Sequence, residues 1–405
     1  MMYWEKLNQR SNLFTILIAV ALVLVFVFTL NKPPADEAPD MGYTADTVKA
    51  EVLSIAEEGS VQMGDVTQTY QIINLRVLEG QYEGQEFTTD YGRRYILPSD
   101  YLLRPGEKIL VSVAQMPDGN TFVHFVDFVR TNSLIILGLF FVLVCVLVSG
   151  WKGVRSLLGI GVSVLVIIYF IVPRILNGQN PIMISLLGSF FFLTVTQYLV
   201  YGWTLKTHIT MAAISLAILF TGLMALFFVD LVRLNGMGDE NAMYILTQYN
   251  QLNIKNLLIA GIMIGSLGIL DDLVVGQTSA VIEIYRANPA MRFQQRFKRA
   301  MNVGRDHIAA TVNTLVLAYL GASLSLFLLF SNSNVAFSTL MNFNYLAEEI
   351  VRSLVGTVGL FTAVPITTFI ACWVVDDPNR LEKLVRAFGP LLNPSELHQE
   401  PASGD

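Results

Sequence analysis

Two adjacent acidic residues, Asp271 and Asp272, lie in the middle of the apolar segment 257–285. An ionisable side chain at the centre of a membrane helix costs at least about 2.5–3.5 kcal/mol, so such residues face protein or water and mark functional sites. Two neighbouring carboxyl groups in a medium of low dielectric constant exchange protons as a coupled pair. The sequence therefore predicts a site that holds and releases a proton or a cation near the middle of the membrane.

Small residues form one face of the same predicted helix. At about 100° per residue, Asp272 shares this face with Ser279, Glu283 and four glycines, and Asp271 and Thr278 point to the adjacent flank. The glycines are Gly261, Gly265, Gly268 and Gly276. Small residues let membrane helices approach closely, so we expect a helix of this chain or of a second copy to pack on this face. Glu283, about three turns beyond the pair, is the candidate for the next relay step.

The apolar segment 308–330 supplies candidate polar partners for the two acids. Asp306 and Asn313 share one face of this predicted helix and Thr314 is adjacent, whereas Tyr319 lies about 120° from Asn313, at roughly the depth of the acids. The pattern leaves open which face meets the acids. It also leaves open whether the pair binds protons or, with Asn313, a divalent metal ion, or only hydrogen-bonds a neighbouring helix.

Long apolar segments dominate the chain. Of its 405 residues, 53% are hydrophobic and 14% are charged, whereas a soluble protein has about 25% charged residues. About 20 apolar residues cross a bilayer as a helix, and eight segments are close to that length: residues 13–30, 133–149, 157–173, 182–201, 210–229, 257–285, 308–330 and 354–375. We predict a polytopic α-helical membrane protein with about eight spans, of which the first is a retained anchor.

Lysine and arginine residues set the predicted orientation of these spans. With Lys6 and Arg10 inside, alternation through eight spans also places the basic segments 286–305 and 380–386 inside. Both termini are therefore predicted to be cytoplasmic. Residues 286–305, in which two phenylalanines lie among basic side chains, are predicted to form an amphipathic helix at the membrane surface.

Residues 31–130 are polar and are predicted to lie outside the membrane, between the first and second spans. Five stretches rich in Val, Ile, Thr, Tyr and Phe are separated by Gly- and Pro-containing turns. They are residues 47–55, 69–78, 85–90, 108–114 and 121–127. Five short strands in about 100 residues favour a small all-β domain of the OB-like barrel type. Arg93, Arg94 and Arg104 suggest an anion-binding loop, although a solvated surface is the favoured interpretation.

The predicted organisation follows from these segments. Residues 1–12 form a cytoplasmic N-terminus, 13–30 an anchor helix, 31–130 the β domain, 131–377 a seven-span membrane domain and 378–405 a cytoplasmic tail.

Several classes of function find no support in the sequence. The net charge is −6 and no basic stripe is interleaved with aromatic residues, so we expect no nucleic-acid partner. Cys145 and Cys372 lie in apolar segments, where they are predicted to be buried small hydrophobic residues. No zinc-protease, phosphate-loop or Cys–His motif is present. We predict no catalytic residue and no cofactor apart from protons or a cation as the coupling ion.

Two strings of residues resemble the YibE/F family of bacterial membrane proteins. They are GSLGILDDLVVGQTSAVIE at 265–283 and NVGRDHIAATVNTLVLAYLGASL at 302–324. The resemblance implies a multi-span protein of the bacterial cytoplasmic membrane and implies no particular activity.

The acid-bearing helix is also similar to the fourth span of resistance-nodulation-division (RND) exporters, in which an aspartate pair carries protons. This similarity implies a proton-carrying role for Asp271 and Asp272. The chain differs from that family in its small outer domain, its single membrane unit, its two additional spans and its lack of a counterpart to the relay lysine. The similarity is therefore one of architecture alone.

Three function classes follow, with different partners. The favoured one is a proton-coupled transporter or proton-driven motor that uses the aspartate pair to move an unidentified substrate. The alternative is a non-enzymatic cell-envelope factor that binds a partner or wall polymer through its outer β domain. An enzyme is least favoured, because an intramembrane aspartyl protease needs carboxylates on two facing helices, and here both lie on one turn. The lipid bilayer and a second copy of the chain are the other expected partners.

Overall fold

The computed structural model describes residues 47–64, 66–93, 96, 101–115, 121–238, 240–249, 251–331 and 335–392. The predicted first span, the N-terminal segment before it, Arg94 and the last part of the tail lie outside the described residues. The chain divides into two compact units, Asp36–Leu147 on the one hand and Met1–Ala35 with Val148–Asp405 on the other. Each unit is therefore described by itself.

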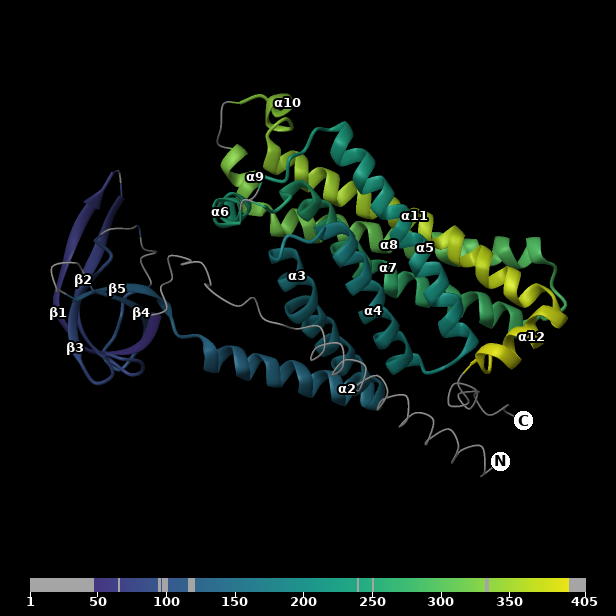
Figure 1. Cartoon of the computed structure of the whole chain (residues 1–405), viewed down its shortest axis with the longest axis horizontal. Coiled ribbons are helices and arrows are strands. Elements are labelled where there is room, and N and C mark those ends of the chain that lie inside the picture. Colours follow the sequence, from purple (N-terminus) through teal and green to yellow (C-terminus); the bar gives the residue numbers. More distant parts are fainter. Residues whose placement is uncertain are drawn as a thin grey trace. The chain divides into compact units, whose positions relative to one another are not determined.

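The first unit contains a small antiparallel β domain, as predicted (Figure 1). Its five strands follow one another in the sheet order β3-β2-β1-β4-β5. They are β1 (Thr47–Met63), β2 (Val66–Val77), β3 (Glu86–Tyr91), β4 (Lys108–Gln115) and β5 (Thr121–Phe128). β1 and β2 are longer than predicted, because the polar residues up to Met63 pair with β2 across a tight turn in which Gly64 has a φ of 62°.

The two outer strands of this order approach each other. The hydroxyl of Thr89 in β3 donates a hydrogen bond to the carbonyl oxygen of Val123 in β5, at 2.5 Å. Alternate residues of the strands point inward and form a core of their own, in which Ile73 and Val111 are fully buried. Such alternation is what a sheet with one buried face requires. The domain therefore has a hydrophobic core independent of the membrane helices.

Tyr91 is a buried polar residue of this domain. Its side chain is 0% exposed, and its hydroxyl donates a hydrogen bond to the carbonyl oxygen of Tyr101 at 2.6 Å. Burial raises the pKa of Tyr91 to about 12, and the negative charges of Glu107 and Asp127 add to this effect. The phenol is therefore held in its neutral form.

The rest of the described chain is helical. Five helical stretches of the described residues are long and apolar enough to cross a membrane, which identifies a membrane protein. The total of eight spans remains a prediction. The elements are α2 (Thr131–Val166), the π-helix η1 (Ile167–Ile171), α3 (Val172–Leu176), α4 (Pro181–Tyr201), α5 (Leu205–Leu231), α6 (Glu240–Gln248), α7 (Ile254–Ala287), α8 (Phe293–Ala322), α9 (Leu324–Ser331), α10 (Phe337–Leu340), α11 (Asn344–Asp376) and α12 (Pro378–Phe388).

The predicted second and third spans fall within one helical stretch, Thr131–Leu176. Its 46 residues correspond to about 69 Å of helix at 1.5 Å per residue, which is enough for two crossings. Gly150, with φ 55° and ψ −137°, breaks the helical geometry between the two predicted spans. Only glycine adopts this conformation readily, so the break coincides with the one residue type that permits it.

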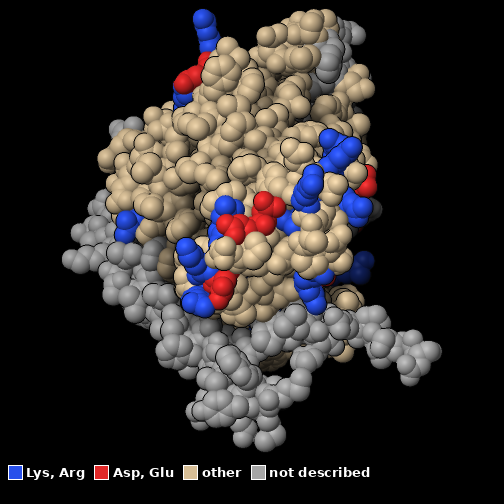
Figure 2. Space-filling view, turned by 90° about the vertical axis from the view of Figure 1, so that its right-hand side faces the viewer, with Lys and Arg blue, Asp and Glu red and all other residues tan. Residues whose placement is uncertain are grey.

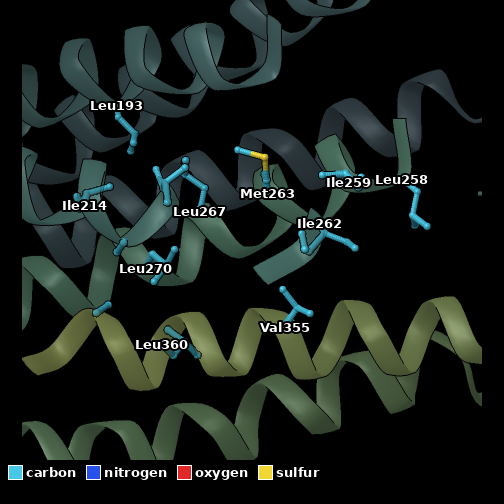
Figure 3. Close-up of a cluster of buried hydrophobic side chains, with 14 of the residues drawn as sticks. Leu193, Ile214, Leu258, Ile259, Ile262, Met263, Leu267, Leu270, Val355 and Leu360 are labelled. Atoms are coloured by element: carbon cyan, nitrogen blue, oxygen red, sulfur yellow. The ribbon is translucent and has the colours of Figure 1, made fainter. Parts of the chain in front are cut away.

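Helix α7 lies at the centre of the second unit and contacts α4, α5, α8 and α11. Figure 3 shows the apolar core around it, to which Leu267 and Leu270 of α7, Ile214 of α5 and Leu360 of α11 contribute. Asn253 caps the start of α7, since its side chain accepts a hydrogen bond from the backbone N–H of Asn256 at 2.9 Å. A helix with apolar residues on most of its circumference is buried by neighbours, as here.

The amphipathic helix predicted for residues 286–305 begins later, at Phe293, and continues into the next predicted span, and its place at the membrane surface stays a prediction. After a short turn, α8 runs without interruption from Phe293 to Ala322 and includes the predicted seventh span from residue 308 onward. The reason is that Arg296, Ala300 and Gly304 form one face of α8 that is buried in the bundle. The basic segment therefore packs as the first turns of a long helix.

Candidate functional site

The first acid of the pair lies between two helices. Asp271 on α7 is half-buried, and its carboxylate accepts a hydrogen bond from the side-chain amide nitrogen of Gln197 on α4. Gln197 is 1% exposed. A hydrogen bond from a buried amide to a carboxylate compensates part of the cost of removing the charge from water. α4 therefore supplies the partner that the sequence analysis did not identify.

Only one end of the Gln197 amide, the nitrogen, bonds to Asp271. Its oxygen Oε1 is buried and has no hydrogen-bond partner among the described residues. Tyr201 ends α4 four residues later, which corresponds to about 6 Å of helix rise. The chain passes directly from the end of α4 to the start of α5, where the N–H of Leu205 donates a hydrogen bond to the carbonyl of Pro390, just after α12. Gln197 and Asp271 therefore lie toward the α12 end of the bundle.

The second acid points elsewhere. Asp272 is exposed within the described part of the molecule, as are Gly261, Gly265 and Gly268 on the same face of α7. A Cβ atom built at Gly261 or Gly268 would meet no described atom within 4 Å. The face of small residues thus has room for a closely approaching helix, and the expectation of such a partner remains a prediction.

Helix α8 runs antiparallel to α7 along one edge of this face. A Cβ atom at Gly276 would lie 3.3 Å from the ring of His307, and one at Gly265 would lie 3.9 Å from the hydroxyl of Tyr319. The stretch of α8 between His307 and Tyr319 is therefore level with Asp272. Tyr319 therefore contacts α7 near Gly265, and which face of α8 meets the two acids stays a prediction.

The other polar candidates on α8 are exposed in the described chain: Asp306, Asn313 and Thr314. Most of the hydroxyl groups near the acids are occupied by their own helix. Thr278 donates to the carbonyl of Val274 at 2.8 Å, Ser279 to that of Val275 at 2.8 Å and Thr314 to that of Ala310 at 3.1 Å. Such bonds to the preceding turn are typical of Ser and Thr inside helices.

Glu283, the predicted next step of a relay, is exposed near the end of α7. Its carboxylate accepts a hydrogen bond from Arg286 at 3.0 Å. This pair lies one turn apart on the helix surface, where ion pairs contribute little to stability.

A second buried polar cluster joins three helices. The amide nitrogen of Gln277 on α7 donates to the carbonyl oxygen of Ala300 on α8 at 2.9 Å and to the hydroxyl of Thr368 on α11 at 2.7 Å. Gly304 lets α8 approach so closely that a Cβ atom there would lie 2.9 Å from Oε1 of Gln277. This cluster fixes α8 against α7 and α11.

A buried arginine closes the α12 end of the bundle. Arg296 is 1% exposed, and its guanidinium lies 3.5 Å from the carboxylate of Asp376 and donates to the carbonyl of Met291 at 2.7 Å. The guanidinium also lies over the ring of Tyr285, 5.2 Å from its centre. Figure 2 shows this end face, on which basic side chains gather beside acidic ones. Asp376 therefore has a buried partner.

The opposite end contains a buried acid that the sequence analysis did not single out. Glu348, in the first turns of α11, is 5% exposed. Its carboxylate accepts hydrogen bonds from the backbone N–H of Gly238 at 3.1 Å and from Asn344 at 3.0 Å. These bonds tie the loop before α6 to the start of α11.

A bound metal ion needs several ligating side chains gathered at one place. Within the residues that the structure describes, no group of three or more His, Cys, Asp or Glu side chains is arranged to hold a metal ion. Asp271 is joined by the side-chain amide of Gln197, and the choice between a proton and a metal ion at the pair stays a prediction.

Gln197, beside the candidate site, and Gln277, in the second polar cluster, are buried residues that sequence reasoning missed. Each is a glutamine inside a long apolar segment, and a polar residue in a membrane helix is a signal in itself because it must find a partner. The sequence showed the signal, but the helical pattern alone could not pair residues of different helices.

Helices long enough to cross a membrane, with buried polar side chains that link α4 to α7 and α7 to α8 and α11, define a polytopic membrane protein. The chain belongs to the YibE/F-like protein family, whose model matches residues 137–377, more than half of the 405 residues. Comparison with curated proteins and with solved structures finds no match. The similarity to RND exporters thus gains no support from these comparisons.

Proposed function

We propose that this protein is a proton-coupled membrane transporter or proton-driven motor in which the Asp271–Asp272 pair takes up and releases the coupling ion. The observation that carries the proposal is the contact between Asp271 and the buried amide of Gln197 at the interface of α4 and α7. A carboxyl group is costly to place between membrane helices. Its retention there, with one dedicated partner, favours a role for its charge.

The two acids differ in environment and in direction. Asp271 lies between helices, and Asp272, the next residue, is exposed on the adjacent face of α7. Neutralising Asp271 changes its hydrogen bond with α4, whereas neutralising Asp272 changes the polarity of the open face. Proton uptake by the pair therefore biases the packing of α7 in two directions, which is the property a coupling site needs.

The proposed location is the bacterial cytoplasmic membrane, with both termini in the cytoplasm and residues 31–130 outside. The face of the bundle at α12 carries basic side chains of α8 and α12 (Figure 2). Basic residues prefer the cytoplasmic side, which supports this orientation. Protons, or a monovalent cation in their place, are the proposed coupling ion, and no other cofactor is proposed. The similarity to RND exporters is compatible with this role and adds no further step.

Purified protein in proteoliposomes tests the proposal. A pH gradient is imposed across the membrane, and uptake of metal ions and organic anions is screened for the unsubstituted protein, Asp271→Asn and Asp272→Asn. Asp230→Asn is the matched control, because Asp230 is an exposed acid at the end of α5 that pairs with Lys255. Uptake that depends on the gradient and on either central acid supports the proposal. Uptake that is equal in all four proteins contradicts it.

A non-enzymatic envelope factor is the second candidate, and the β domain supports it. The strand order, together with the approach of β3 and β5 through Thr89 and Val123, is compatible with a small barrel of the OB-like type. Folds of this type bind oligosaccharides and oligonucleotides on their surface. Deletion of residues 31–130 separates the candidates: loss of cellular function on deletion, with Asp271→Asn and Asp272→Asn fully active, favours the envelope factor.

A further inference from the structure

We propose that the side-chain amide of Gln197 reverses its orientation each time Asp271 takes up or releases a proton. The inference rests on the proposed function, because it assumes that Asp271 is a proton carrier. It assigns to Gln197 of α4 the role of a hydrogen-bond partner for both the ionised and the protonated form of Asp271.

The first observation is the present orientation of the amide. Nε2 of Gln197 faces the carboxylate of Asp271 and donates to it, which is the arrangement suited to the ionised acid. Oε1, on the same amide group, is buried and has no partner among the described residues. A buried acceptor without a donor costs free energy, so the burial of this unpaired oxygen calls for an explanation.

The second observation is what the neutral acid requires. When a proton adds to the carboxylate, the resulting carboxyl group gains an O–H donor that must find an acceptor in an apolar interior. Helix α4, which already bonds Asp271 through Gln197, supplies such an acceptor in Oε1 once the amide rotates by about half a turn about its last side-chain bond. The same residue then satisfies the acid in both states, and the proton itself comes from and returns to water.

The helices that pack against α7 carry several charged and titratable groups. Asp272 is the neighbour whose charge acts on Asp271. On α4 the titratable residues are Tyr198 and Tyr201, and those of α5 lie at its ends, namely Lys206, His208 and Asp230. α8 contributes His307 and Tyr319 along its α7-facing edge, and its Asp306 is exposed. Arg292 directly precedes α8, and the first turns of α8 carry Arg296, Lys298, Arg299 and Arg305. α11 carries Glu348, Glu349 and Arg352 near its start and Cys372 and Asp376 near its end.

An amide at this place differs from an amide that only joins helices. Gln277 is also 1% exposed and also lies within the bundle, but it donates to Ala300 and Thr368, which do not titrate. Its hydrogen bonds therefore have no reason to change with pH. Gln277→Leu is the matched control for Gln197→Leu, since both substitutions remove a buried glutamine amide from the same bundle.

Infrared difference spectroscopy of the full-length protein in lipid bilayers tests the inference. The protein is synthesised with carbon-13 in the glutamine side-chain carbonyl, and spectra are recorded while the buffer is cycled between acidic and alkaline pH. We expect a protonated-carboxyl band at acidic pH that is absent in Asp271→Asn, together with an isotope-sensitive shift of one glutamine carbonyl. That shift is expected to vanish in Gln197→Leu and in Asp271→Asn and to persist in Gln277→Leu.

The outcomes separate the inference from the function on which it rests. If the Asp271 band appears but no glutamine shift is lost in Gln197→Leu, the amide reversal is wrong and the proton carrier stands. If no band assignable to Asp271 appears at any pH, both are wrong. If Gln197→Leu does not fold, the loss or persistence of the shift in Asp271→Asn still decides, because that variant keeps Gln197 and removes the proton.

Discussion

Gln197 on α4 donates a hydrogen bond to Asp271 on α7, while Asp272, the next residue, lies on a different face of the helix and is exposed. One turn of α7 therefore presents two carboxyl groups to two different environments. The two directions follow from the rotation of about 100° between successive residues of a helix.

Removal of Gln197 should destabilise the protein through Asp271. Gln197→Leu leaves a carboxylate between helices without its donor, which costs about 1–3 kcal/mol. Combining it with Asp271→Leu should recover most of this loss, because no polar group is then left unpaired. Thermal unfolding in detergent measures both variants. Equal melting temperatures for the single and double variants would show that the two side chains are not coupled.

Gly304 is expected to tolerate no side chain. In Gly304→Ala the new methyl group would lie 2.9 Å from Oε1 of Gln277 and closer still to Val364, and such overpacking costs about 1–3 kcal/mol. Gly321→Ala on the same helix is the control, since a Cβ atom there meets no described atom within 4 Å. We expect a lower melting temperature for the first variant and an unchanged or higher one for the second. The reverse order would contradict the close packing of α8.

Tyr91 should make the β domain sensitive to alkaline pH. Its pKa is raised by burial to about 12 from an ordinary value of 10.0, so the folded domain binds the phenolic proton more tightly than the unfolded chain does. The stability from this residue is therefore complete below pH 10 and is lost as the pH rises toward 12. Limited proteolysis of the full chain across this range measures the loss. Tyr91→Phe should flatten the dependence, and an unaltered profile would contradict the assignment.

The open face of α7 should meet a second copy of the chain. We replace Cys145 and Cys372 by serine and introduce Gly268→Cys, at a position where the new side chain has room. Oxidation in native membranes is expected to give a cross-linked dimer on gel electrophoresis. Leu216→Cys on α5, which is also exposed, serves as the control and should stay monomeric. Cross-linking of the control alone would place the contact elsewhere.

Much of the fold was predictable from the sequence, for identifiable reasons. The five strands follow from alternation of apolar residues between turn residues, and α4, α5, α7 and α11 follow from apolar runs of sufficient length. The break at Gly150 was expected as a loop between two spans, and the structure has it as a kink within one helical stretch. The continuity of α8 was not predictable, since burial of Arg296 depends on Asp376, which is 80 residues later in the chain.

The candidate site was predictable on one helix and not between helices. Helical periodicity correctly separated the directions of Asp271 and Asp272, because it needs only the 100° rotation per residue. It gave more weight to Asp272 on the face of small residues, whereas the structure places the buried partner, Gln197, beside Asp271. Pairing of α4 with α7 is a tertiary contact, and no local pattern in either segment encodes it.

Proton movement through the membrane tests most directly whether Asp271 carries the coupling ion. Proteoliposomes that contain a pH-sensitive dye are prepared with a lumen more acidic than the external buffer. The internal pH is then followed for the unsubstituted protein, Asp271→Asn and the control Asp230→Asn. We expect that the protein dissipates the gradient in the presence of a metal ion or organic anion that the uptake screen identifies, that Asp271→Asn does not, and that Asp230→Asn behaves as the unsubstituted protein does. Equal dissipation by Asp271→Asn, in a protein shown to be folded and inserted, would contradict the account.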